Sequence, residues 1–138
     1  MGGVAQALRE MTIAYYIASP TWGGGEQYVY DLARHIKKDY QATVLFLFPK
    51  GSDPSMIARF QELGACPAFD FSGKWWRFSP MAGRKLARIL EQNEVDVLHI
   101  NSRQSYFLSV YAKHYAHRSI RLIAVQHLVP KAKNSFFW

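Results

Sequence analysis

A buried strand, a run of three glycines and an amphipathic helix follow one another directly near the N-terminus of the chain. Residues 13–18 are apolar, Pro20 ends the run, and the glycines at 23–25 precede a helical pattern that begins at Glu26. A strand–turn–helix unit of this kind presents free backbone N–H groups and the positive end of a helix dipole at the carboxyl edge of a sheet. Glycines let the backbone approach an anion because they carry no Cβ atom. The unit therefore predicts a phosphate-binding turn, although three glycines also suit a tight turn that binds nothing.

The glycine run does not match the two common nucleotide-binding signatures. A Gly-x-Gly-x-x-Gly pattern would place Tyr28 at its third glycine, and the second predicted strand runs into Pro49 and Lys50 without an acidic residue that could bind a ribose. No Gly-Lys-Ser/Thr sequence follows the turn, so the Walker pattern is excluded as well.

Apolar runs and amphipathic stretches alternate along the rest of the chain. Apolar runs predict strands, and apolar residues at helical spacing predict helices. Strands separated by helices require crossover connections, so we expect one α/β domain around an open, mostly parallel sheet in the order 3-2-1-4-5, with helices on both faces. The predicted strands are residues 13–18, 42–48, 66–71, 95–100 and 120–126, and the predicted helices are residues 26–38, 53–63, 105–117 and a segment that begins at Ser79.

Polar side chains follow two of the predicted strands. The fourth strand delivers His99, Asn101 and Ser102 to its carboxyl end, and the fifth delivers His127. Ligands of open α/β sheets bind beyond the carboxyl ends of the strands, so we expect these side chains to lie on the same rim as the glycine turn. A histidine taken alone is more often structural, but the position of His127 just past an apolar strand favours a functional role.

Positive charge is concentrated in the second half of the chain. The net charge is +7, and residues 74–138 hold eleven of the seventeen Lys and Arg residues but three of the ten acidic ones. A one-sided basic half favours an anionic partner, although a solvated basic surface without a specific partner has the same composition. No zinc-finger spacing or ribonucleoprotein signature is present, so nucleic acid is not the expected partner.

Other features bound the class of protein. No apolar run approaches the ~18–20 residues of a membrane span, and residues 1–10 lack the apolar core of a signal peptide, so we interpret them as an N-terminal extension.

The single Cys66 permits no internal disulfide and indicates a reducing compartment, most simply the cytoplasm. Its apolar surroundings favour a buried thiol over a nucleophile. We expect no metal or cofactor, since the His-x-x-His pair at 114 and 117 has no third ligand nearby.

Two tryptophans beside two cations form a second unusual segment, at Lys74, Trp75, Trp76 and Arg77. Tryptophan settles at membrane interfaces and Lys or Arg pairs with anionic head groups, so the segment suits a membrane surface or a lipid-phosphate acceptor. Alternatively, one tryptophan covers the core and the other packs against a further domain.

Three landmarks in order resemble the N-terminal half of the GT-B glycosyltransferases of family 4. They are a Gly-Gly-x-Glu turn followed by a helix with Leu-Ala, an Asp-Val-Leu-His-Ile strand at Asp96–Ile100, and a strand that ends in His127. The resemblance runs over residues 11–127. It implies a Rossmann-like domain, one half of a retaining enzyme that moves a sugar from a nucleotide-sugar donor to a glycan or lipid-linked acceptor.

The resemblance also implies roles for individual residues. Gly23, Gly24 and Gly25 are expected at the donor diphosphate, and His127 is expected to be catalytic beside the transferred sugar. Asn101 replaces the second histidine of the family's frequent His-x-His, of which His99 is the first. The residues expected in the cleft on the acceptor side are Glu26, His99, Asn101, Ser102 and Lys131.

The family's donor-binding half, with its Glu-x7-Glu signature, is not found in these residues. We therefore expect residues 11–138 to be an acceptor-side domain that is inactive alone and associates with the inner face of a membrane from the cytoplasm. Two other interpretations remain open: a stand-alone module that binds a nucleotide or phosphosugar, and one half of a split transferase. A GT-B epimerase that acts on nucleotide sugars is an alternative among enzymes.

Overall fold

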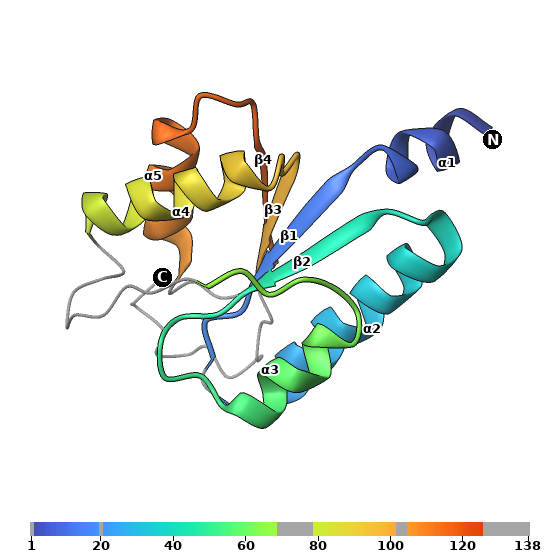
Figure 1. Cartoon of the computed structure of the whole chain (residues 1–138), viewed down its shortest axis with the longest axis horizontal. Coiled ribbons are helices and arrows are strands. Elements are labelled where there is room, and N and C mark those ends of the chain that lie inside the picture. Colours follow the sequence, from blue (N-terminus) through green and yellow to red (C-terminus); the bar gives the residue numbers. More distant parts are fainter. Residues whose placement is uncertain (1, 20, 69–78, 102–104, 126–138) are drawn as a thin grey trace, which may run out of the picture.

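Four parallel strands form one open sheet in the order β2-β1-β3-β4. The structure is a computed structural model, which describes residues 2–19, 21–68, 79–101 and 105–125 (Figure 1). The strands are β1 Thr12–Tyr16, β2 Thr43–Leu47, β3 Val97–Ile100 and β4 Arg121–Ala124. The strand β3 lies in the fourth predicted strand, and β4 lies in the fifth. The observed order therefore agrees with the predicted order 3-2-1-4-5 for the second, first, fourth and fifth strands.

Helices cover the two faces of the sheet (Figure 1). The helices α2 and α3 lie on one face, and α4 and α5 lie on the other, while α1 lies beyond the amino end of β1. Their bounds are α1 Gly2–Arg9, α2 Gly24–Tyr40, α3 Pro54–Gln61, α4 Pro80–Gln92 and α5 Tyr106–Tyr115. The predicted fold class, an open parallel α/β sheet of Rossmann-like design, is confirmed.

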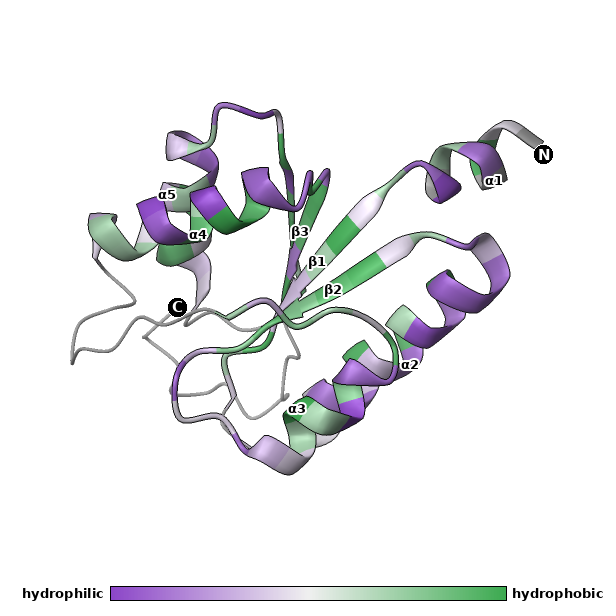
Figure 2. Cartoon of the chain, in the orientation of Figure 1, coloured by the Kyte–Doolittle hydropathy of each residue, from purple (hydrophilic) through white to green (hydrophobic). Residues whose placement is uncertain are grey.

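The core has two halves because successive side chains of a strand point to opposite faces. Ala14 and Tyr16 of β1 pack with α4 and α5, whereas Ile13 and Tyr15 pack with α2 and α3. Figure 2 shows hydrophobic segments in β1, β2 and β3 and hydrophilic segments along α2 and α4. Burial on both faces explains why β1 and β2 have continuous apolar sequences.

The predicted third strand, at residues 66–71, is wrong in its described part. Ala65 forms an isolated parallel bridge with Leu45, and residues 66–68 belong to no strand, while 69–71 fall outside the described residues. Pro67 has no N–H to donate to a ladder, which accounts for the early end of the pairing. The bridge still lies on the outer edge of β2, where a third strand was expected.

Glycine at position 64 has a packing role at this edge. A Cβ atom there would lie 2.2 Å from the carbonyl oxygen of Val44, so any other residue would push the chain away from β2. Gly64 therefore allows a close approach of two backbones just after α3 ends. The start of α3 follows the prediction, since the carboxylate of Asp53 caps it by accepting a 3.0 Å hydrogen bond from the Ser55 N–H.

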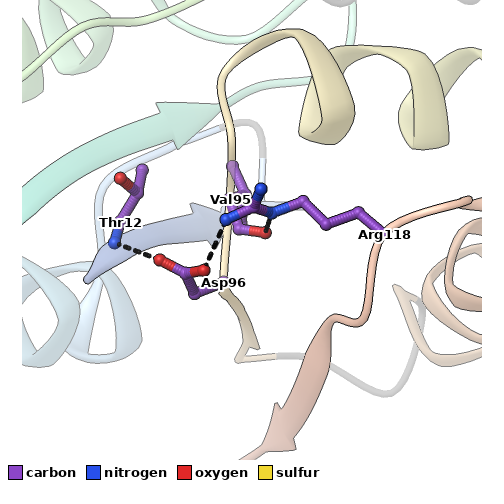
Figure 3. Close-up of polar contacts among 4 residues, drawn as sticks. All are labelled: Thr12, Val95, Asp96 and Arg118. Atoms are coloured by element: carbon purple, nitrogen blue, oxygen red, sulfur yellow. Dashed lines mark hydrogen bonds and ion pairs between the residues drawn. The ribbon is translucent and has the colours of Figure 1, made fainter. Parts of the chain in front are cut away.

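A carboxylate joins the strands at the amino edge of the sheet (Figure 3). Asp96 accepts a hydrogen bond from the backbone N–H of Thr12 at 2.9 Å and another from the Arg118 guanidinium at 2.6 Å. The same guanidinium donates to the carbonyl of Val95 at 3.0 Å. Asp96 thus links the start of β1, the start of β3 and the loop before β4 at the edge opposite the glycine turn.

None of the helices in the described part of the chain is both long enough and apolar enough to cross a membrane.

Candidate functional site

The glycine turn lies at the carboxyl end of β1, where the order of the sheet reverses. The chain leaves β1 for α2 on one face, and β3, the neighbour of β1 on its other side, is reached through α4 on the opposite face. Loops at such a switch point diverge and leave a crevice at the carboxyl edge. The predicted site therefore falls where an open α/β sheet binds its ligands.

The local geometry of the turn leaves backbone donors free of a side-chain cap. Gly23 is the N-cap of α2 in an extended conformation (φ −155°, ψ −166°) and provides no side-chain hydrogen bond, while the Gln27 N–H donates to its carbonyl at 3.0 Å. The first N–H groups of an α-helix have no partner within the helix. Together with the helix dipole, they form a site suited to an oxyanion.

The glycines of this turn do not serve to reach a left-handed conformation. Among the described glycines, positive φ occurs at Gly51, which lies in another loop. A Cβ atom at Gly24 would meet no heavy atom within 4 Å, so internal packing does not require glycine there either. Open space in front of Gly24 favours the ligand interpretation over the tight-turn interpretation.

Glu26 is part of the turn itself. It lies in the first turn of α2 and is 8% exposed, and its Oε2 atom would lie 3.2 Å from a Cβ at Gly23. A carboxylate at this end of a helix is favoured by the dipole. The carboxylate is also a hydrogen-bond acceptor beside the uncapped amides. It can accept a hydrogen bond from a sugar hydroxyl, but its negative charge repels a phosphate at close range.

Asn101 joins the end of β3 to the glycine turn. Its Nδ2 donates a 3.0 Å hydrogen bond to the carbonyl of Gly25, across 76 residues of sequence. The structure thus brings together the amide after the fourth predicted strand and the turn after the first. The convergence expected at this rim is observed for these two residues.

His99 lies inside β3 rather than beyond its end. It is 6% exposed, and its ring centroid lies 5.1 Å from that of Tyr15, on the side of the sheet covered by α2 and α3. Burial raises the pKa of Tyr15 well above its ordinary value, with a smaller contribution from Tyr28, so the neighbouring hydroxyl stays protonated. β3 ends at Ile100, as the sequence predicted, so His99 lies inside the strand, where the sheet and its covering helices bury it. A cleft role for His99 stays a prediction.

Several predicted site residues lie outside the described residues. These are Ser102, His127 and Lys131, which the sequence predicts at the rim, and the segment Lys74, Trp75, Trp76 and Arg77. Their roles stay predictions from the sequence.

The sequence did not predict an aromatic cluster that contacts Trp22, directly before the glycine turn. Trp22, the residue before Gly23, contacts Phe60 and Arg59 of α3 and Tyr30 of α2. The available signal was a tryptophan directly before a glycine run, but the sequence does not show which helix supplies its partners.

The chain matches the family model described as Glycosyltransferase Family 4 over residues 22–138. No curated protein sequence matches the chain. Among solved structures, a glycosyltransferase from Rickettsia africae ESF-5 is similar with a TM-score of 0.65 and 18% sequence identity, over 88% of this chain and 32% of that one. The chain thus spans about a third of the length of that enzyme.

Two universal stress proteins share the fold. One, from Burkholderia pseudomallei, has a TM-score of 0.52 and 12% identity, and covers 85% of this chain and 96% of its own. The other, from Arabidopsis thaliana and solved with AMP bound, has a TM-score of 0.51 and 10% identity, over 90% of this chain and 97% of its own. At these identities the likeness concerns the fold alone.

Proposed function

Because the chain belongs to glycosyltransferase family 4, we propose that it is the acceptor-side domain of a retaining enzyme that moves a sugar from a nucleotide-sugar donor to a glycan or lipid-linked acceptor. The observation that carries this proposal is the uncapped glycine turn at the start of α2, with open space in front of Gly24 and a tie to β3 through Asn101. The turn is suited to the diphosphate of the donor.

The chemistry of the turn fits a departing diphosphate. Negative charge grows on the leaving group as the bond to the sugar breaks, and fixed amide donors stabilise it with little reorganisation. In this proposal Gly23, Gly24 and Gly25 present those donors. The Glu26 carboxylate, which is fixed beside them, orients a hydroxyl of the sugar or of the acceptor by accepting its hydrogen bond.

The remaining roles come from the sequence and the family. His127 is proposed as the catalytic residue beside the transferred sugar, and Ser102, Lys131 and His99 complete the acceptor side. A second, donor-binding domain would supply the contacts to the nucleoside, so transfer by this chain alone is not expected.

An anionic membrane surface is the proposed further partner, reached from the cytoplasm. Its basis in the sequence is the segment at residues 74–77, and exposed side chains of α4 and α5 support it. Apolar side chains are exposed at the start of α4 and α5, with Met81 68% and Tyr106 and Phe107 each 50% exposed. Basic side chains of α4, namely Arg84, Lys85 and Arg88, are exposed as well.

The experiment that tests the diphosphate site is the substitution Gly24→Val in the complete two-domain enzyme. The new side chain has room in the folded chain but would occupy the space proposed for the diphosphate, so transfer should fall much more than stability. Gly3→Val in α1 is the matched control, because Gly3 is also a helical glycine with open space around it. A folded Gly24→Val enzyme with the transfer rate of the control would refute the assignment.

A further inference from the structure

Trp22 is held in a box of aromatic rings immediately before the glycine turn. Its ring centroid lies 5.4 Å from that of Phe60 and 5.8 Å from that of Tyr30. Phe60 is fully buried, and its ring lies 4.7 Å from Phe46 of β2. The box is therefore anchored in the sheet core and fixes one residue next to the turn.

Arg59 closes the box from the solvent side. Its guanidinium carbon lies 4.1 Å from the centroid of the Trp22 ring and 5.3 Å from that of Tyr30. A planar cation stacks on an indole face, where the ring quadrupole attracts it. Arg59 belongs to α3, and Trp22 belongs to the loop between β1 and α2. The stack therefore links two segments that are distant in the sequence.

The turn is then held on both sides. Trp22 precedes Gly23 and is fixed by α3, while the Gly25 carbonyl is fixed by Asn101 at the end of β3. Gly23 is the N-cap of α2 and Gly24 and Gly25 are its first residues, where a helix frays most easily and glycine restrains the backbone least, so the anchors contribute to fixing their conformation. An anion site made of backbone amides binds well only when those amides are already in place.

We infer that Arg59 is a positioning residue, which fixes the conformation of the glycine turn by stacking on Trp22 and so prepares the turn for a diphosphate. The second part of this inference rests on the proposed function of the turn. Arg59 does not touch the diphosphate in this account, and its effect passes through the tryptophan.

The test follows two signals of the 15N-labelled chain by NMR. The first is hydrogen exchange of the Gln27 amide, whose bond to the Gly23 carbonyl forms only when the turn is in place. The second is the affinity for inorganic pyrophosphate, read from the amide shifts of residues 23–27 at constant ionic strength. The variants are Arg59→Ala, Arg59→Lys and the control Arg34→Ala, whose guanidinium lies 6.0 Å from the Tyr30 ring and pairs with Asp31.

We expect Arg59→Ala to accelerate exchange at Gln27 and to weaken pyrophosphate binding, each by about two- to fivefold, with little change in the midpoint of thermal unfolding. Arg59→Lys keeps the charge but loses the planar group, so it should resemble the alanine variant. Arg34→Ala should leave both signals unchanged.

Unchanged exchange at Gln27 in folded Arg59→Ala would overturn the inference, and so would full rescue by lysine, because the charge alone would then act. If the unaltered chain fails to bind pyrophosphate, the proposed diphosphate site is refuted. In that case faster exchange at Gln27 in Arg59→Ala still supports the positioning of the turn, and unchanged exchange overturns it.

Discussion

Replacement of Asp96 by alanine should destabilise the whole sheet. The carboxylate of Asp96 accepts the Thr12 N–H at 2.9 Å and the Arg118 guanidinium at 2.6 Å (Figure 3). A hydrogen bond to a charged acceptor contributes about 1.5–3 kcal/mol. The ion pair adds less, roughly 0.2–1 kcal/mol, because the side chains of Arg118 and Asp96 are 38% and 31% exposed.

The expected loss is about 2 kcal/mol rather than the sum of these upper values, since water can reach the half-buried Thr12 N–H once the carboxylate is gone. For a chain of this length that loss lowers the midpoint of thermal unfolding by roughly 6–8 °C. Thermal and urea unfolding followed by circular dichroism measure both quantities. The site lies at the opposite edge of the sheet, so binding at the glycine turn should change little in the variant that remains folded.

Two further variants separate the contributions. Asp96→Asn keeps an oxygen for the Thr12 N–H but loses the ion pair, so it should cost about half as much as alanine or less. Asp31→Ala is the control, because Asp31 forms an exposed pair with Arg34 at 3.7 Å on one helix, which contributes at most about 0.5 kcal/mol. An Asp96→Ala chain as stable as the Asp31→Ala chain would refute the reasoning.

Four other outcomes are expected. Burial raises the pKa of the Cys66 thiol to about 11, so alkylation by iodoacetamide should be slow near neutral pH and accelerate as the pH rises towards that value; rapid reaction at neutral pH would contradict it. Gly83→Ala places a Cβ atom 2.4 Å from the Tyr111 Cβ between α4 and α5, and should lower the free energy of unfolding by about 1–3 kcal/mol, which an unchanged urea midpoint would disprove. His127→Ala in the complete enzyme should lower turnover by orders of magnitude with little change in thermal stability, whereas a large stability loss with normal specific activity would make the histidine structural. Replacing Trp75 and Trp76 by serine should weaken co-sedimentation with anionic vesicles, as should salt in the unaltered chain; equal binding to neutral and anionic vesicles would count against the basic segment.

The strands and their order could be predicted because the signal that defines them is local. Residues 13–18, 42–48 and 95–100 are mostly apolar, and each range overlaps a strand of the observed sheet. The fifth predicted strand has the same apolar pattern, yet β4 is partly open, with Ile123 46% exposed. An apolar run thus predicted this strand correctly. It did not indicate that a strand at the edge of the sheet leaves some of its apolar side chains exposed.

Two elements were predicted incorrectly from local sequence patterns: the helix α1 and the third strand. The helix α1, Gly2–Arg9, was not predicted, because we interpreted residues 1–10 as an N-terminal extension and an eight-residue helix is too short for a clear periodic signal. The third strand was predicted from its apolar residues, but Pro67 limits its pairing to the Ala65 bridge. A proline inside an apolar run was the signal that should have shortened it.

The site was predictable in position and less so in contacts. Topology alone places Gly25 and Asn101 on one rim, because neighbouring parallel strands end at the same edge. That the amide of Asn101 meets the Gly25 carbonyl depends on the path of two loops, which no spacing in the sequence encodes. His99 is the next-to-last residue of β3, and its burial follows from the helices that cover both faces of this central strand, which the spacing of polar residues does not encode.

The amide at position 101 has a consequence for how the turn responds to pH. The family resemblance leads us to expect the second histidine of a His-x-His pattern at position 101, but the residue there is Asn101, whose Nδ2 donates to the Gly25 carbonyl at 3.0 Å. An imidazole at this position would change charge and donor number between about pH 5 and 8, whereas an amide keeps the same two N–H donors throughout. The Asn101 restraint on the glycine turn therefore does not change with pH, so a change in anion affinity near neutrality would come from the anion itself or from another group at the rim.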